Sequence, residues 1–306
     1  MRITNAQVTR DTIARLTVNS SRLAEAQDRV STGLKVQKMS DDPTAASAIM
    51  QASSGMRAIE QFRTNVAGVG SALDAEDNAL DQVGSLITRA KELAVSQSGA
   101  NASAQTRQAA AQEVKALLAQ AVQIGNTRIG DAYLFGGANS PSTAPFDVNQ
   151  SNVVPRYVSI VAPAVTPQLP QGMRSVEIAA GQTMQGAHDG DAVFVQTGVL
   201  QSLHDLYTAL NTNDMPGITT AMPELDTAFD TVQSLVGDVG ARRNQVDTVD
   251  ASLDAFESNL KTLKSGLAEV DMEEAITEMV AKQTAYQAAM LASSKVMGLS
   301  LTEYLR

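Results

Sequence analysis

The C-terminal third contains the stretch that decides the fold: LDTAFDTVQSLVGDVGARRNQVDTVDASLDAFESNLKTLKSGLAEV, residues 225–270. Apolar residues recur there at alternating steps of three and four. Only two positions of the series, Ala228 and Arg242, lack a large apolar side chain. The series is Leu225, Val232, Leu235, Val239, Val246, Val249, Leu253, Phe256, Leu260, Leu263, Leu267 and Val270. This heptad spacing is typical of a left-handed coiled coil. It predicts one helix of about 70 Å, and we expect Leu260 and Leu263 to be buried along its seam.

The N-terminal part of the chain predicts three more helices. In the first, Leu16, Leu23 and Val30 recur every seven residues, with Ile13 and Leu34 beside the stripe. Gly33 is a plausible helix stop, because glycine readily takes the left-handed conformation after a helix. A second helix should run from about residue 43 to 98, and a third should include residues 114–124.

The middle of the chain has a different composition. Proline and glycine are frequent from about residue 136 to 198, and short β-prone runs appear at 156–161 and 192–195. We interpret this region as a strand-rich insertion between two helical halves. The predicted fold is therefore mainly α with an inserted β-rich domain, in which a long bundle forms from both terminal regions and both termini lie at the same end.

This pattern predicts three domains. Terminal assembly helices should form an inner core from residues 1–42 and 268–306. Long helices should form a bundle from residues 43–137 and 224–267. The inserted outer domain should occupy residues 138–223.

Composition excludes several classes of protein. The 306 residues are 43% hydrophobic but only 4% aromatic, and they include no cysteine, which excludes disulfides and thiolate metal sites. The formal net charge of −10 disfavours binding to nucleic acid or to anionic membranes. The N-terminus opens no apolar run of a secretory signal, and no apolar stretch is long enough to predict a transmembrane helix.

No group of residues predicts catalysis, a cofactor or a metal. His188 and His204 have no second histidine or cysteine nearby, so ordinary packed or surface histidines are expected. The Asp189–Asp191 segment lacks the remaining ligands of a calcium loop, and a tight turn is the better interpretation. We therefore expect no enzyme and no cofactor.

The pair Asp41 and Asp42 precedes a proline. A carboxylate pair could serve acid–base chemistry, but Asp42 can cap free backbone N–H groups and Pro43 suits the first helical position. We interpret Asp41, Asp42 and Pro43 as a helix cap in a turn between domains.

The two ends of the chain carry opposite charge. Residues 1–40 hold seven basic and three acidic residues, net +4, whereas residues 264–306 hold four basic and six acidic residues, net −2. Opposite signs favour pairing of the ends, either within one chain or between neighbouring copies. The apolar stripes alone leave an intramolecular bundle, a dimeric coiled coil and a polymer seam as open alternatives.

Several separated motifs resemble the bacterial flagellin family. They are STGLKV at 31–36, SDDPTAA at 40–46, KELAV at 91–95, QIGNT at 123–127, GARRN at 240–244, QTAYQAAM at 283–290 and SLTEYLR at 300–306. They occur in the family's order over roughly residues 1–137 and 224–306. Within the family, MRIT at 1–4 and YLFGG at 133–137 are most similar to the subunits of the hook–filament junction.

The resemblance implies a structural subunit that assembles through its terminal helices. Such proteins leave the cell through the flagellar type III apparatus, and a chaperone holds their C-terminal region before assembly. The implied partners are further copies in a ring or short helical layer, hook-associated protein 1, flagellin and that export chaperone, and the implied location is the extracellular flagellum. The assembly residues that we expect are Ile13, Leu16, Leu23, Val30, Leu34, Ile276, Met279, Tyr286, Met290, Met297, Leu301 and Leu305.

Three alternatives stay open. A filament flagellin would form long filaments alone. A signalling coiled coil would need an uninterrupted antiparallel hairpin. An enzyme in the central region would need a group of catalytic residues.

Overall fold

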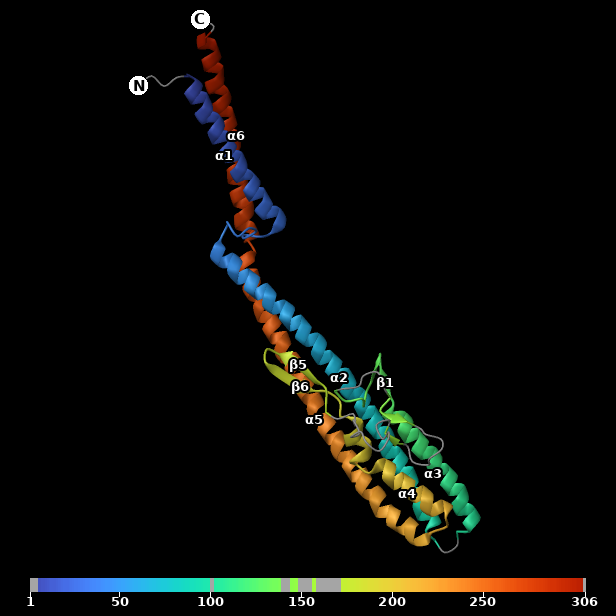
Figure 1. Ribbon diagram of the computed structural model, residues 1–306. Helices are drawn as coiled ribbons and strands as arrows, with labels where there is room; N and C mark the ends of the chain where they lie inside the picture. The colour runs from blue at the N-terminus through green and yellow to red at the C-terminus, as the bar shows by residue number, and fades with distance from the viewer. Residues whose placement is uncertain (1–4, 100–101, 139–143, 148–155, 158–171, 305–306) are drawn as a thin grey trace, which may run out of the picture. The chain divides into compact units, whose positions relative to one another are not determined.

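The computed structural model describes residues 5–99, 102–138, 144–147, 156–157 and 172–304. Its α-helices are α1 (Asn5–Thr32), α2 (Pro43–Gln97), α3 (Ala104–Gly125), α4 (Val199–Asn211), α5 (Met215–Ala268) and α6 (Met272–Tyr304). The long helices expected at 43–98 and 225–270 are both present, which confirms the predicted mainly α fold with a small strand-containing region (Figure 1). None of the described helices is long and apolar enough to span a bilayer.

The chain forms two compact units. One combines Met1–Ala58 with Ala255–Arg306, and the other is Ile59–Asp254. The boundary falls inside α2 and α5, whereas the sequence pattern suggested divisions near the helix ends. The finer division into three domains stays a prediction.

Helices α2 and α5 pack against each other in opposite directions. In the unit of residues 59–254, Arg63 pairs with Asp254 at 2.6 Å, Gly70 lies against Arg243 and Val246, and Lys91 pairs with Asp226. An added Cβ at Gly70 would lie 2.6 Å from the guanidinium of Arg243, so a larger residue there would require the end of that side chain to move. The helix continues through Gly70 without a break, although glycine has a low helix propensity.

The heptad seam of α5 is buried over only part of its length. Five positions spaced by seven are buried: Leu225, Val232, Val239, Val246 and Leu253. Beyond them, Phe256 is 62% exposed and Leu263 is 50% exposed, and Leu260 is only half-buried. The expectation of burial at Leu260 and Leu263 was therefore wrong.

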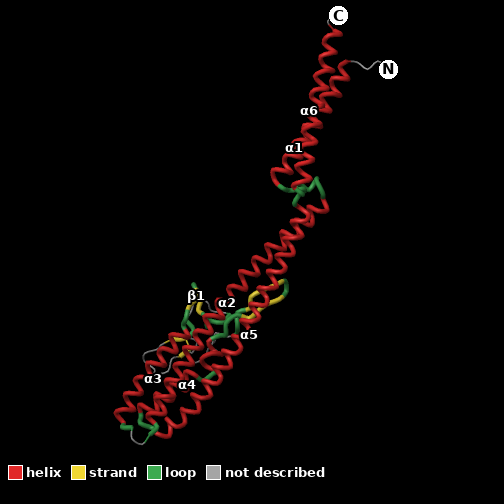
Figure 2. The backbone as a smooth tube through the Cα atoms, turned by 180° about the vertical axis from the view of Figure 1, so that it is seen from behind, coloured by secondary structure: helices red, strands yellow, loops and turns green. Residues whose placement is uncertain are grey.

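Burial along α5 follows the number of segments that pack against this helix. Between residues 59 and 254, α5 packs against α2 and also against the segment near Gly186, whose carbonyl accepts a hydrogen bond from Arg242 at 3.0 Å. Beyond residue 254, α2 is the helix beside α5 (Figure 2). A single partner helix covers one narrow stripe, so the remaining apolar side chains there stay open to solvent.

The strands that the structure describes in the central region form three antiparallel pairs. These are β1 (Arg128–Ile129) with β2 (Ala132–Tyr133), β3 (Phe146–Asp147) with β4 (Arg156–Tyr157), and β5 (Ser175–Ala179) with β6 (Gln182–Gln185). The strand expected at 156–161 begins at Arg156, and its remainder lies outside the described residues.

One expectation for the central region was wrong. Residues 192–195 lie in the π-helical turn η1 (Asp191–Val195) and not in a strand, because Asp189 accepts a hydrogen bond from the Ala192 N–H at 2.8 Å and starts a helical turn. The described strands lie before residue 199, and α4 and the start of α5 follow at residues 199–211 and 215–223. Leu203, Leu206 and Leu210 give α4 one fully buried face.

Three phenylalanines anchor this region. Phe194 meets Phe135 and Phe146 edge to face, with ring centroids 5.3 and 5.2 Å apart. All three are almost completely buried. Asn126 fixes Phe146 by exchanging two hydrogen bonds with its backbone, at 2.7 and 3.0 Å. Among the described residues, the buried aromatic side chains are thus concentrated at this one point, and the rest of the core is aliphatic.

Candidate assembly surface

Helices α1 and α6 lie side by side, with the two chain ends at the same end of the pair (Figures 1 and 2). They run antiparallel, so that Arg29 near the end of α1 lies beside Glu278 near the start of α6. Small residues make the close contact: Ala26 and Ala275 are each 4% exposed, and Ser293 is also buried. Small side chains allow two helix backbones to approach closely, but they bury little apolar area per residue.

Several of the larger apolar side chains of this pair are exposed to solvent. Those between 46% and 67% exposed are Ile13, Val18, Ile276, Val280, Met290 and Leu291. Exposed apolar side chains that gather on one surface mark an interaction site more often than scattered single ones do. The pair therefore presents apolar surface that a single copy leaves open.

The predicted assembly residues divide into three groups. Ile13, Ile276 and Met290 are exposed, whereas Leu16, Leu23, Val30, Leu34, Met279 and Tyr286 are half-buried. The side chains of Met297, Leu301 and Leu305 lie outside the described residues. The structure brings the first two groups together in one helix pair and its connection, and their role in assembly stays a prediction.

The connections that follow α1 and precede α6 pair with each other. Gly33 takes a positive φ of 69° and ends α1, as the sequence predicted. Leu34 and Glu269 then form an antiparallel bridge, in which Lys35 N–H donates to Ala268 O at 2.6 Å and Val270 N–H donates to Gly33 O at 3.0 Å. The two segments are held together, although more than two hundred residues separate them in sequence.

The turn before α2 is built by two neighbouring carboxylates. Asp42 accepts hydrogen bonds from the Thr44 and Ala45 N–H groups at 2.9 and 3.0 Å, so it caps the helix that Pro43 begins. Asp41 accepts from the backbone N–H groups of Lys38 and Gln37 at 2.9 and 3.1 Å. The bond from Lys38 and then that from Gln37 hold the pKa of Asp41 below its usual range, because they stabilise the carboxylate form.

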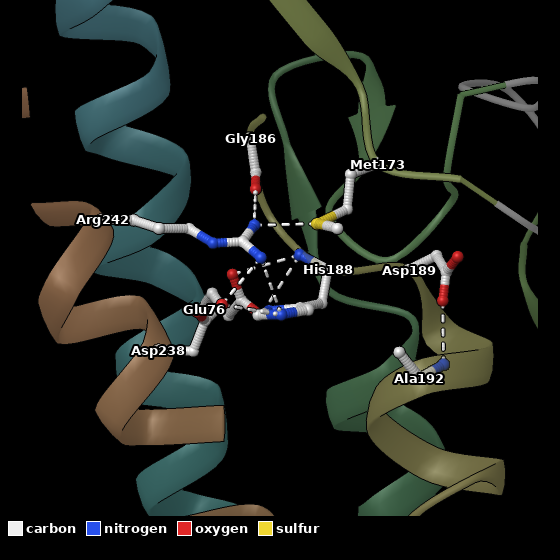
Figure 3. A network of polar contacts seen from close by, with 8 residues as sticks. All are labelled: Glu76, Met173, Gly186, His188, Asp189, Ala192, Asp238 and Arg242. Carbon is white, nitrogen blue, oxygen red and sulfur yellow. Dashed lines mark hydrogen bonds and ion pairs between the residues drawn. The ribbon is translucent and has the colours of Figure 1, made fainter. Parts of the chain in front are cut away.

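A buried polar cluster lies in the other unit, around His188 (Figure 3). Glu76 on α2 has no solvent exposure, and its Oε1 atom lies 2.6 Å from Nδ1 of His188. The same carboxylate accepts the backbone N–H of His188 at 3.2 Å. On the other side of the imidazole, Nε2 lies 3.1 Å from Oδ2 of Asp238 and 3.2 Å from Nη2 of Arg242.

This cluster has a structural explanation. A buried carboxylate is costly unless charged or hydrogen-bonded groups compensate it, and His188 and its neighbours supply that compensation. No group of three or more His, Asp or Glu side chains among the described residues is arranged to hold a metal ion. Sequence reasoning placed His188 as an ordinary packed histidine but missed Glu76, because a lone glutamate within a helical pattern gives no sign of its burial.

The other polar candidates also serve local structure. Asp189 accepts from the Gly172 N–H at 2.7 Å and caps η1, which leaves its carboxylate occupied by backbone groups. His204 is half-buried on α4, and its Nδ1 atom has no hydrogen-bond partner among the described residues. Arg107, which the sequence did not single out, is buried and donates to Gln97 O, Gly99 O and the Asn213 side chain at 2.6–3.2 Å.

Comparison with known proteins defines the class. The model of the bacterial flagellin N-terminal helical region matches residues 3–140, and that of the bacterial flagellin C-terminal helical region matches residues 222–305. The chain belongs to the bacterial flagellin family, whose members are structural proteins of the flagellum and not enzymes.

Within this family the chain resembles flagellar hook-associated protein 3. It is 26% identical to that protein of Escherichia coli over 301 residues, which are 90% of each chain. It is also 24% identical to the flagellin of Bacillus subtilis over the full length of both chains. Among solved structures, a putative flagellar hook-associated protein from Vibrio parahaemolyticus superposes with a TM-score of 0.64 at 17% identity, covering 75% of this chain and all of that one. The chain is thus a structural component of the bacterial flagellum similar to hook-associated protein 3.

Proposed function

We propose that this protein forms the junction between the flagellar hook and the filament, where its copies assemble through the α1–α6 pair. The observation that carries this proposal is the exposed apolar surface of that pair, in a chain similar to hook-associated protein 3.

The energetics support assembly of this kind. Burying a side chain of the size of Ile, Val, Met or Leu contributes about 1.5–3 kcal/mol relative to leaving it exposed. Six such side chains on α1 and α6 are about half exposed or more in one copy. Contact with neighbouring copies would bury them, so the pair gains stability in the assembly that it lacks alone.

The proposed partners follow from this role. One layer of copies would contact hook-associated protein 1 on the hook side and flagellin on the filament side. Before assembly, an export chaperone would cover the C-terminal region, and the chain would leave the cell through the type III apparatus of the flagellum. Covering the exposed apolar residues of α6, such as Val280, Met290 and Leu291, would prevent premature association.

Filament flagellin is the second candidate, and the full-length similarity to the Bacillus subtilis flagellin favours it. The two roles differ in position and in number of copies. A junction protein occupies one short zone, whereas a filament subunit repeats along the whole filament.

Immunogold labelling of intact flagella tests the proposal. Antibodies against this protein should label a short zone at the hook-proximal end of each filament, and a strain without the gene should release flagellin into the medium. Labelling along the filament would identify a filament flagellin. If intact flagella carry no label and no fraction of purified flagella contains the protein, both roles are refuted.

A further inference from the structure

We propose that the α1–α6 pairs of neighbouring copies pack side by side with an axial stagger of about 25 Å, which places the basic half of one pair against the acidic foot of a second copy. The proposal rests on the proposed assembly through α1 and α6, and adds the relative position of the two copies.

Charge is distributed unevenly along the α1–α6 pair. The part of the pair toward the chain ends, here called the basic half, carries Arg10, Arg15 and Arg22 on α1, with Asp11 as the one acid of α1 before Glu25. Helix α6 adds Lys295 and Glu303 to this part. The opposite end, here called the acidic foot, is defined by Glu269, Asp271, Glu273, Glu274 and Glu278. The pair is therefore basic near the chain ends and acidic where α5 passes into α6.

These charges are only partly neutralised within one copy, where Glu278 pairs with Lys282 on the same helix at 3.7 Å and with one residue of α1. Among the described side chains of α1 and α6, one ion pair joins the two helices, between Arg29 and Glu278 at 3.4 Å. Helix α6 has no acidic residue between Glu278 and Glu303, so the basic half of α1 faces a stretch of α6 that offers it no carboxylate. Arg15 and Arg22 are exposed, and so are Glu273 and Glu274.

Helix geometry sets the size of the stagger. Arg15 lies fourteen residues before Arg29, a distance of about 21 Å at 1.5 Å per residue. Arg29 marks the level of Glu278, and Glu274 lies about one helical turn beyond it, about 5 Å farther. A displacement of about 25 Å brings the level of Arg15 in one copy to the level of Glu274 in the next.

Apolar groups meet at the same displacement. The exposed Ile13 and Val18 lie at the level of Arg15, whereas the exposed Ile276 and Val280 lie at the level of the acidic foot. Copies in register would place basic groups beside basic groups and acidic groups beside acidic groups. The staggered arrangement instead joins opposite charges and apolar surfaces in one contact, and close contact is required because salt screens charges beyond about 8 Å under physiological conditions.

A charge-swap experiment tests the arrangement in cells that lack the native gene. The first variant, Arg15→Glu with Arg22→Glu, makes the basic half acidic. The second, Glu273→Lys with Glu274→Lys, makes the foot basic. A control, Lys115→Glu with Lys261→Glu, makes the same change in net charge as the first variant at exposed positions on α3 and α5.

Each swap variant alone should be reduced in purified flagella by about tenfold or more, because like charges then face each other between copies. Co-expression of the two variants should restore incorporation, since copies that alternate again join opposite charges. The control should incorporate as the wild-type chain does. Recovery on mixing also shows that both variants are folded and exported.

Other outcomes overturn the proposal. Normal incorporation of either variant alone would mean that these charges do not set the contact. Failure of the mixture, with both variants exported, would mean that the charges act within one copy or toward another protein. Absence of the wild-type chain from flagella would instead refute the proposed function, and the stagger with it.

Discussion

Replacement of Glu76 by alanine should destabilise the unit of residues 59–254 far more than replacement of a neighbouring carboxylate on the same helix. Glu76 has no exposure, accepts the backbone N–H of His188, and lies within hydrogen-bond distance of the His188 Nδ1 atom. Its removal leaves two buried polar groups without a partner. Breaking a buried pair by removing one member typically costs about 3–5 kcal/mol.

Asp74 provides a matched comparison. It lies two residues from Glu76 on α2 and also pairs across to α5, with Arg243 at 3.2 Å, but both side chains of this ion pair are about half exposed. An exposed ion pair contributes about 0–1 kcal/mol. For a unit of this size each kcal/mol shifts the melting temperature by about 2–4 °C.

Thermal unfolding followed by circular dichroism at a helix wavelength measures the difference. Glu76→Ala should lower the melting temperature by about 6–20 °C, and Asp74→Ala by less than about 4 °C. Glu76→Gln should lie between them, because its amide oxygen can still accept one of the two hydrogen bonds. Equal melting temperatures for Glu76→Ala and Asp74→Ala would refute the reasoning, since burial is the property that separates the two sites.

Three further predictions follow from the described contacts. Leu225→Ala, at a fully buried position of α5, should lower the free energy of unfolding by about 2–5 kcal/mol. Leu263→Ala, at a half-exposed position, should change it by less than about 1 kcal/mol. Urea unfolding of the two variants measures both values, and equal losses would contradict the prediction. The turn that Asp41 holds should be intact above the ordinary carboxyl pKa and should loosen as pH falls through the lowered pKa of Asp41. Amide hydrogen exchange in the turn should therefore become faster at acid pH. Asp41→Asn should abolish this dependence of exchange on pH. Removal of residues 290–306 should abolish incorporation into flagella while the unit of residues 59–254 keeps its melting temperature, and normal flagella from the truncated gene would contradict the role assigned to α6.

The helices were predictable because their signals are local and repeated. The heptad series from Leu225 and the cap at Asp42 each place a helix from residues that are near one another in sequence. Residues 192–195 were misassigned because a short apolar run fits either a strand or a helical turn, and the carboxylate of Asp189 decides between them through a backbone hydrogen bond.

The extent of burial was not predictable from periodicity alone. Leu253 and Leu263 occupy the same apolar series, yet one is buried and the other is half exposed, because the helix loses its additional neighbours between them. The contact of Glu76 with His188 joins residues 112 positions apart, and no local pattern indicates it. The opposite net charges of residues 1–40 and 264–306 did indicate that the two ends of the chain are complementary. The sequence left open whether these ends pair within one copy or between copies.

The antiparallel packing of α2 and α5 has a consequence for the order of folding during synthesis. Gly55 on α2 lies against Leu260 on α5, so its partner leaves the ribosome about 200 residues later. At bacterial rates of about 5–20 residues per second, α2 waits about 10–40 s for the helix that covers its apolar face. During that interval the chain cannot complete its long-range contacts, which slows folding relative to a protein of local contacts. Because Leu260 is made about 200 residues after Gly55, a chain that is still in synthesis lacks the bundle contacts that the later part of α5 supplies.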